Sequence, residues 1–204
     1  AAFQEGQDIH TATAARVFDV APNAVTRAQR SQAKTVNFGI IYGVSAFGLS
    51  QQTELNRTEA KELIDTYYAS YPQLRNYMSD QVNFAREHGY VATVLGRRRY
   101  LKDINSQNAV VRGAAERNAV NAPIQGSAAD IIKLAMIRLQ QRIQEDGWQA
   151  KMLLQVHDEL VFEVPKTELA DFQILVKKEM EQAFTLDVPL EVDLGVGQNW
   201  LEAH

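Results

Sequence analysis

The chain contains no cysteine among its 204 residues, which excludes disulfide bonds, thiolate nucleophiles and cysteine-ligated zinc and is compatible with a reducing cytoplasm. No apolar run approaches the roughly 20 residues that a membrane-spanning helix needs. The first residues lack the basic and then apolar order of a signal peptide. We therefore expect no membrane partner, and a cytoplasmic protein is compatible with these absences.

The chain also lacks a methionine at position 1, an internal repeat and a low-complexity tract. Because it opens inside a polar segment, we expect a fragment of a longer protein. Hydrophobic residues make up 46% and charged residues 23%, an ordinary globular composition. This length can bury a core in one large domain or two small ones.

Charge is distributed unevenly along the chain, whose formal net charge is -4. Residues 1–150 hold 17 basic against 14 acidic residues, whereas residues 151–204 hold 4 against 11. This asymmetry favours a basic working face and an acidic part elsewhere that suits a metal ion. The alternative is that the charges merely cover a solvated surface.

Two short apolar runs between Leu153 and Val164 meet at His157, Asp158 and Glu159. The runs predict a β-hairpin with the charged residues at its tip. A polar turn is the simple explanation, but tight turns favour Asn-Gly or Asp-Gly because they need positive φ. Successive strand side chains point to opposite faces, so a metal ion at Asp158 would need a second carboxylate from elsewhere.

The remaining patterns are mostly helical and predict an α+β fold. Helices are expected at residues 8–20, 26–42, 56–70, 71–89, 108–145 and 166–184, with a capping box at Thr26 and Gln29 and a break or kink at Pro123. Residues 90–95 and 188–194 are expected to be strands, and the second should share a sheet with the hairpin.

One face of the helix predicted at 26–42 carries Arg30, Lys34, Phe38 and Tyr42 at four-residue spacing, before a left-handed stop at Gly43. Two cations one turn apart repel each other, so the pair makes sense when an anion such as a triphosphate lies between them. The aromatic rings can stack on a base or a sugar. The alternative is a half-exposed amphipathic helix.

A run of three arginines, Arg97, Arg98 and Arg99, is expected at a turn. Their mutual repulsion favours phosphate-backbone contact over a solvated loop, which remains the alternative.

Arg117, Asn121 and Gln125 recur at four-residue spacing on a later helix. Such side chains donate hydrogen bonds to minor-groove acceptors, which are nearly independent of base sequence. This polar face is therefore suited to hydrogen bonds with base edges or sugars.

Three strings together resemble the bacterial family A DNA polymerases, of the DNA polymerase I type. RSQAKTVNFGIIYG, from Arg30 to Gly43, is similar to the fingers-helix motif, and QVHDE, from Gln155 to Glu159, to the palm carboxylate motif. Asn118 to Asp130 is similar to the segment between them. In this order and at these separations the combination is very specific, and the resemblance covers essentially the whole chain.

The resemblance implies roles for individual residues. Arg30, Lys34 and His10 would bind the phosphates of the incoming deoxynucleoside triphosphate, and Lys34 would also protonate the departing pyrophosphate. Phe38 would pack on the sugar and base, as in members that discriminate against dideoxynucleotides. Tyr42 and Gly43 would line the pocket of the templating base. Contacts to primer-template DNA are also implied at Arg117, Asn121, Gln125 and His157.

The implied reaction is phosphoryl transfer with two Mg2+ ions. Asp158 would be a metal ligand and Glu159 an accessory carboxylate. The family takes a further carboxylate from an Asp-Tyr-Ser-x-x-Glu-Leu-Arg motif, which is absent here and is expected in a segment before Ala1. The resemblance therefore implies a fingers-like region at 1–120 and a partial palm at 121–204.

We thus expect part of a bacterial, nucleoid-associated DNA-directed DNA polymerase of replication and repair, inactive without the missing part of the same polymerase. A non-catalytic DNA-binding protein with this fold is the alternative, with salt-sensitive DNA binding and no response to nucleotide. A His-Asp metal phosphohydrolase is a third hypothesis, disfavoured because few histidines remain and the strand context is wrong.

Overall fold

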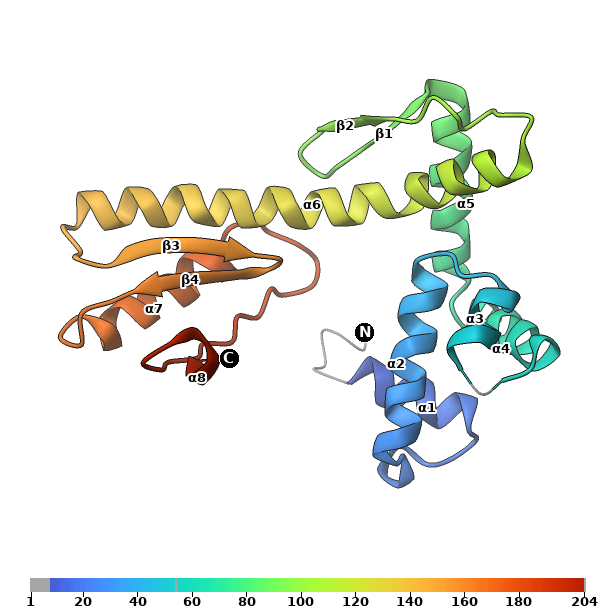
Figure 1. Ribbon diagram of the computed structural model, residues 1–204, viewed down its shortest axis with the longest axis horizontal. Coiled ribbons are helices and arrows are strands. Elements are labelled where there is room, and N and C mark those ends of the chain that lie inside the picture. The colour runs from blue at the N-terminus through green and yellow to red at the C-terminus, as the bar shows by residue number, and fades with distance from the viewer. Residues whose placement is uncertain (1–7, 54, 204) are drawn as a thin grey trace. The chain divides into compact units, whose positions relative to one another are not determined.

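The computed structural model describes residues 8–53 and 55–203, which form a mostly helical α+β chain (Figure 1). The α+β expectation is confirmed. The chain divides into two compact units, Ala1–Ile124 and Gln125–His204. Within the described residues, no helix combines the length and the hydropathy that crossing a membrane requires.

The first unit is built mainly from helices and one short hairpin. Its elements are α1 (Ile9–Val17), the 3-10 helix η1 (Pro22–Ala24), α2 (Arg27–Ile41), α3 (Ala46–Gln52), α4 (Arg57–Ser70), α5 (Pro72–His88), β1 (Tyr90–Ala92) and β2 (Arg98–Tyr100). Helix α6 (Ala109–Glu145) begins in this unit and continues into the second, which adds β3 (Lys151–Val156), β4 (Glu159–Glu163), α7 (Leu169–Glu181) and α8 (Trp200–Ala203).

The ends of α2 follow the local sequence signals. The Gln29 side chain accepts a hydrogen bond from the Thr26 backbone N–H at 2.9 Å, and the Thr26 hydroxyl accepts one from the Gln29 N–H at 3.2 Å. This reciprocal pairing is the predicted capping box. After the last turn Gly43 takes φ +74°, a left-handed conformation that glycine adopts without steric cost.

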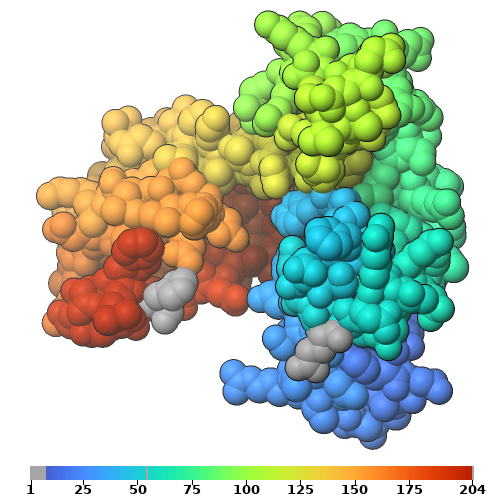
Figure 2. Space-filling model, turned by 45° about the vertical axis from the view of Figure 1, so that its right-hand side comes forward, coloured from blue at the N-terminus to red at the C-terminus, as the bar shows by residue number. Residues whose placement is uncertain are grey.

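A small apolar core fixes the orientation of α2. Val36 and Ile40 of α2 pack with Leu49 of α3 and with Ala60 and Tyr67 of α4. Figure 2 shows the blue and cyan side chains of these helices forming one continuous surface. Because the apolar side of α2 is buried here, its opposite side faces solvent.

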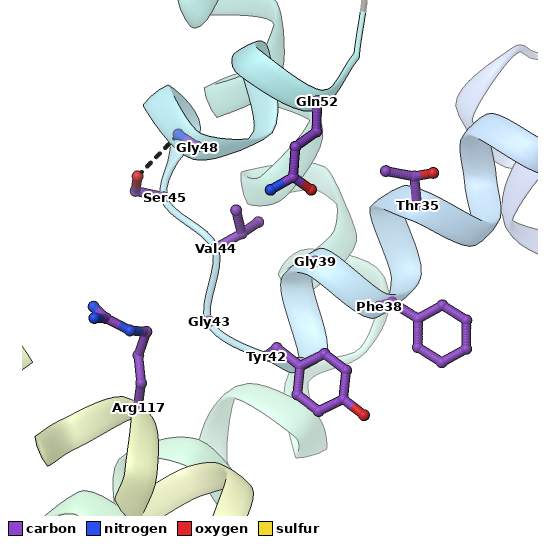
Figure 3. A pocket seen from close by; sticks show the side chains of 10 residues that line it. All are labelled: Thr35, Phe38, Gly39, Tyr42, Gly43, Val44, Ser45, Gly48, Gln52 and Arg117. Carbon is purple, nitrogen blue, oxygen red and sulfur yellow. Dashed lines mark hydrogen bonds between the residues drawn. The ribbon is translucent and has the colours of Figure 1, made fainter. Parts of the chain in front are cut away.

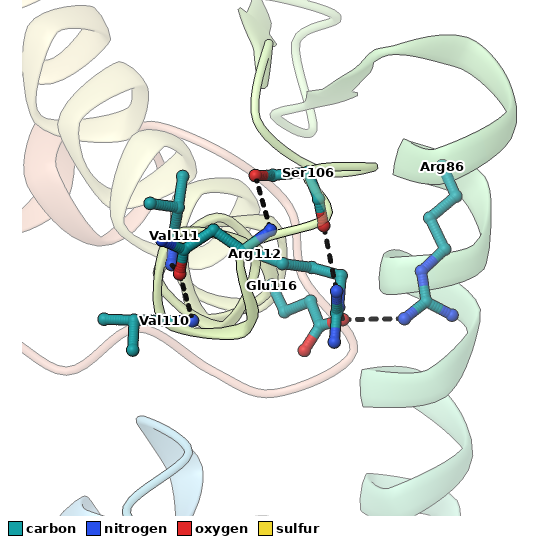
Figure 4. Close-up of polar contacts among 7 residues, drawn as sticks. Arg86, Ser106, Val110, Val111, Arg112 and Glu116 are labelled. Carbon is teal, nitrogen blue, oxygen red and sulfur yellow. Dashed lines mark hydrogen bonds and ion pairs between the residues drawn. The ribbon is translucent and has the colours of Figure 1, made fainter.

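A second core of the first unit joins the end of α5, the β1–β2 hairpin and the start of α6. Arg86 of α5 forms an ion pair with Glu116 of α6 at 2.6 Å, and Arg112 donates to the Ser106 carbonyl at 2.9 Å (Figure 4). The ion pair holds α6 against α5, and the Arg112 hydrogen bond ties the preceding loop to α6.

The hairpin corrects two expectations. The strand expected to reach Leu95 ends at Ala92, because the Gly96 N–H donates to the Thr93 carbonyl at 2.9 Å and closes a turn. Arg98 and Arg99 consequently lie on β2 rather than at the turn, where they pair with Ala92 and Val91.

Pro123 does not break α6, which continues through it. A proline removes only one backbone donor from a helix, and buried residues on both sides, such as Ala119 and Leu139, keep the helix packed. Of the two expectations at this position, the break is wrong and the kink stays a prediction.

The second unit packs the β3–β4 hairpin and α7 on α6, with Leu139, Ile143, Phe172, Leu175 and Val176 in its core. The strand expected at 188–194 is wrong, because none of these residues joins a strand. The Val192 N–H instead donates to the Glu181 carboxylate at 3.1 Å. Alternating hydrophobicity sets the faces of a segment but does not supply a pairing partner.

Candidate functional site

The solvent face of α2 carries a cation followed by two aromatic rings. Nζ of Lys34 lies 5.9 Å from the ring centroid of Phe38. The rings of Phe38 and Tyr42 are stacked, with centroids 6.4 Å apart and planes 12° apart. Both rings are more than 40% exposed, so their faces are accessible to a planar ligand.

Arg30 begins this face and already contacts an anion. Its Nε lies 2.5 Å from a carboxylate oxygen of Asp8, the N-cap of α1. The same carboxylate accepts hydrogen bonds from the Thr11 hydroxyl at 2.6 Å and from the His10 N–H at 3.0 Å. The Arg30 and Thr11 hydrogen bonds hold the pKa of Asp8 well below its usual range, so this carboxylate stays ionised.

The histidine of α1 lies beside the aromatic part of the α2 face. The ring centroid of His10 is 5.6 Å from that of Phe38. Its Nδ1 lies 3.0 Å from Nδ2 of Asn37, a buried residue whose Oδ1 accepts a hydrogen bond from the Thr13 hydroxyl at 3.0 Å. Burial lowers the pKa of His10, and Arg30 and Lys34 add to this effect against the opposing charge of Asp8.

A pocket of about 510 Å³ opens where α2 ends. It is lined by Thr35, Phe38, Gly39, Tyr42, Gly43, Val44, Ser45, Gly48, Gln52 and Arg117. Figure 3 shows Arg117 and Phe38 at opposite ends of it. The pocket thus brings Arg117 of α6 together with Tyr42 and Gly43, three residues singled out by the sequence. It offers a flat aromatic surface and a cation.

The other two residues of the predicted polar face of α6 differ in exposure. Gln125 is exposed, whereas Oδ1 of Asn121 is buried and has no hydrogen-bond partner among the described residues. A buried carbonyl oxygen without a donor is costly. A ligand that donates a hydrogen bond would satisfy it.

The three arginines of the β1–β2 hairpin are exposed. The guanidinium of Arg98 lies 4.5 Å from the ring centroid of Tyr90, and the ring of Tyr100 is 5.8 Å from that of Tyr90. The hairpin therefore presents cations beside aromatic rings, an arrangement that also suits nucleic acid.

The tip of the β3–β4 hairpin is a two-residue loop. Val156 pairs with Glu159, which leaves His157 and Asp158 between the strands. His157 takes φ +53°, so the argument that this sequence disfavours a tight turn is wrong. The side-chain amide of Gln155 donates to the His157 carbonyl and stabilises the loop.

The two predicted metal ligands lie next to each other at this tip. Asp158 is exposed, and Glu159 begins β4. Carboxylate oxygens are the donors that Mg2+ prefers. Within residues 8–53 and 55–203, no group of three or more histidine or acidic side chains is placed to hold a metal ion. The donor type fits Mg2+, and the number of donors requires ligands beyond the described ones.

Two residues that support the exposed face of α2 were not predicted from the sequence. The sequence places Asp8 only at the start of the helix expected at 8–20, whereas its contact to Arg30 joins residues 22 positions apart. Asn37 carried an overlooked signal, because it is a polar residue on the buried side of α2 between Val36 and Ile40. Buried polar groups require partners.

Comparison with known proteins gives consistent matches. The family model of DNA polymerase family A matches residues 1–202. DNA polymerase I of Streptococcus pneumoniae (serotype 4) is 56% identical over 203 residues, which are 99% of this chain and 23% of that protein. DNA polymerase I of Geobacillus stearothermophilus is 54% identical over 202 residues, again 99% of this chain and 23% of that protein.

The fold is also similar to a solved structure. The POL domain of Pol1 from M. smegmatis, in complex with DNA primer-template and dNTP, matches with a TM-score of 0.95 and 48% identity, over 99% of this chain and 36% of that one. This chain spans about a quarter of the length of the two DNA polymerase I relatives described above. Because the family match extends over nearly all of its residues, the chain belongs to DNA polymerase family A.

Proposed function

We propose that this chain is the nucleotide-binding and partial palm portion of a DNA-directed DNA polymerase, with a fingers region at 1–120 and a palm region at 121–204. The observation that carries the proposal is the exposed face of α2, where Arg30, Lys34 and Phe38 follow one another beside His10. The solved relative described as a complex with DNA primer-template and dNTP supports both partners.

The α2 face binds the incoming deoxynucleoside triphosphate. Arg30, Lys34 and His10 donate hydrogen bonds to its phosphates, since a guanidinium fork and an ammonium together neutralise a polyanion. Phe38 packs on the sugar and base. Lys34, an ammonium on the same face of α2, donates a proton to the departing pyrophosphate.

The DNA lies over the remaining candidate residues. Tyr42 and Gly43 line the pocket for the templating base together with Arg117. Cationic contacts to the phosphate backbone come from the β1–β2 hairpin, and polar contacts come from α6 and the β3–β4 tip. These contacts are assigned to Arg97, Arg98, Arg99, Arg117, Asn121, Gln125 and His157.

Asp158, with Glu159 beside it, holds Mg2+. Bound Mg2+ neutralises phosphate charge and makes the primer hydroxyl a better nucleophile. The donor set of the described residues is too small to complete such a site. We therefore propose that the isolated chain has no appreciable templated synthesis, and that the rest of a bacterial, nucleoid-associated polymerase of replication and repair completes it.

Titration with dTTP and primer-extension assays on the isolated chain test this proposal. We expect dTTP to bind, Lys34→Ala to weaken binding at least tenfold, and the charge-matched Lys61→Ala on α4 to leave binding unchanged. Primer extension that requires Mg2+, Arg30, Lys34 and Asp158 would contradict the predicted inactivity. Salt-sensitive DNA binding without any response to dTTP would favour the alternative, a non-catalytic DNA-binding protein.

A further inference from the structure

Asn37 is a buried amide in the middle of α2, with 2% of its surface exposed. Its neighbours on that side of the helix, Ala33, Val36 and Ile40, are apolar. The amide reaches across to α1 in two places, because its Oδ1 accepts from the Thr13 hydroxyl and its Nδ2 faces Nδ1 of His10, each at 3.0 Å.

The chemistry of the amide determines where the proton of His10 lies. An amide nitrogen only donates hydrogen bonds, so the Nδ1 atom that it faces must accept. A neutral imidazole that accepts at Nδ1 carries its proton on Nε2. The Thr13 hydroxyl donates to Oδ1 and thereby leaves Nδ2 for the histidine. The contacts of Asn37 with Thr13 and His10 thus select the Nε2–H tautomer of His10.

The electrostatic surroundings of His10 favour the same neutral form. Among the described residues, the charged groups that act on its ring are Asp8 at the start of α1 and Arg30 and Lys34 of α2. Burial is the largest cause of the lowered pKa, and the two cations lower it further. A protonated His10 would add a third cation to the surface that already holds these two.

We propose that Asn37 is a positioning residue that holds His10 as the neutral Nε2–H tautomer, so that His10 offers a hydrogen-bond donor, rather than a charge, to a phosphate oxygen of the nucleotide. The phosphate part of this inference rests on the proposed function, whereas the tautomer rests on the contacts of Asn37 alone. If Asn37 only filled space between the two helices, its replacement would not change the proton position on His10.

Nitrogen-15 NMR of the imidazole rings in the 204-residue chain distinguishes these cases. Protonated and unprotonated ring nitrogens have widely separated shifts, and the chain has four histidines. We expect an unprotonated Nδ1 and a protonated Nε2 for His10. Asn37→Asp, an isosteric change to a group that only accepts, should shift Nδ1 to its protonated position and leave His88 and His157 unchanged.

A second pair of variants covers the case in which a buried aspartate prevents folding. Thr13→Ser keeps the hydroxyl and should preserve the spectrum of His10, whereas Thr13→Val removes the donor and should populate both tautomers. A protonated Nδ1 in the unmodified neutral chain would overturn the proposal. So would an unchanged Nε2–H pattern in the folded Asn37→Asp or Thr13→Val chain.

Addition of dTTP with Mg2+ to the same samples tests the phosphate part. We expect the Nε2–H signal of His10 to shift while Nδ1 stays unprotonated. If dTTP moves the amide signals of Phe38 and Lys34 but leaves Nε2–H unmoved, the role of His10 is overturned and the nucleotide site stands. If dTTP moves none of these signals, the proposed function itself fails.

Discussion

Asp8 and Arg30 form an ion pair at 2.5 Å that links the first residue before α1 to the second turn of α2. The Asp8 carboxylate therefore contacts Arg30, the same guanidinium that we propose binds a phosphate of the nucleotide. Both side chains are partly exposed, so a triphosphate can reach the guanidinium and replace the carboxylate. If Arg30 binds a phosphate as proposed, we expect Asp8 to compete with the nucleotide for this guanidinium.

Removing the charge of Asp8 should strengthen nucleotide binding. Asp8→Asn keeps a good helix cap but leaves Arg30 without its carboxylate. We expect the Kd for dTTP to fall roughly twofold to fivefold, the scale of an exposed ion pair. Asp65→Asn on α4 removes the same charge elsewhere and should leave the Kd unchanged. Weaker dTTP binding by Asp8→Asn would show that the carboxylate organises Arg30 instead of competing for it.

The Asp8 contacts also predict how stability depends on pH. Because the folded pKa of Asp8 lies below its unfolded value, its contribution is fully present above about pH 5 and is lost as the pH falls through the folded pKa. Asp8 also influences the pKa of His10, so the comparison is made in a His10→Gln background. There, the difference in unfolding free energy between the chains with and without Asp8→Asn should be constant from pH 5 to 8 and shrink on acidification. Urea unfolding at a series of pH values measures it, and a difference that grows in acid would contradict the prediction.

The lowered pKa of His10 should also make the free energy of unfolding rise with pH, but in a higher pH range than Asp8 does. Its pKa is lowered in the folded chain, so the unfolded state binds more protons between the folded pKa and about 6.5. The free energy of unfolding should therefore rise with pH up to about 6.5 and be flat above it. His10→Gln should remove this part of the slope, which urea titrations between pH 5 and 8 would detect. An unchanged slope in His10→Gln would assign it to another group.

The hairpin loop predicts an unusual order of substitutions at His157. Its φ of +53° costs a residue with a Cβ roughly 1 kcal/mol, and a β-branched residue more. His157→Gly should keep or raise the unfolding temperature, and His157→Val should lower it. Thermal unfolding followed by circular dichroism ranks the two. A glycine variant less stable than the valine variant would mean that the loop does not hold this conformation.

The core of the second unit should respond strongly to one truncation. Phe172 is 2% exposed and packs edge-on against Trp148 and Phe162. Phe172→Ala should cost about 3–5 kcal/mol of unfolding free energy. Ile174→Ala, on the same helix but 69% exposed, should change it by less than about 0.5 kcal/mol. Urea unfolding provides both values, and equal effects would contradict the assigned packing of α7.

Local signals in the sequence were sufficient for α2. The capping box at Thr26, the four-residue spacing of Lys34 and Phe38 and the glycine stop at Gly43 each act within a few residues, so they predict the helix, its ends and its exposed face. The resemblance supplied His10, which lies 28 residues before Phe38.

Contacts between distant residues were beyond the reach of such patterns. Hydrophobic periodicity shows which side of a helix is buried but not which residue of another helix it contacts. For this reason, neither the Asp8–Arg30 ion pair nor the Asn37–His10 contact was predicted. The same limit explains the wrong strand at 188–194. Its hydrophobic and polar residues alternate, but among the described residues its backbone pairs with no strand.

Primer extension by a chimera tests the central claim most directly. This chain would replace the matching 202 residues of DNA polymerase I from Geobacillus stearothermophilus. We predict that the chimera extends a primer in the presence of Mg2+, that Lys34→Ala and Asp158→Asn each reduce the rate at least a hundredfold, and that Lys61→Ala does not. A folded chimera without extension, or one indifferent to Lys34 and Asp158, would contradict the account.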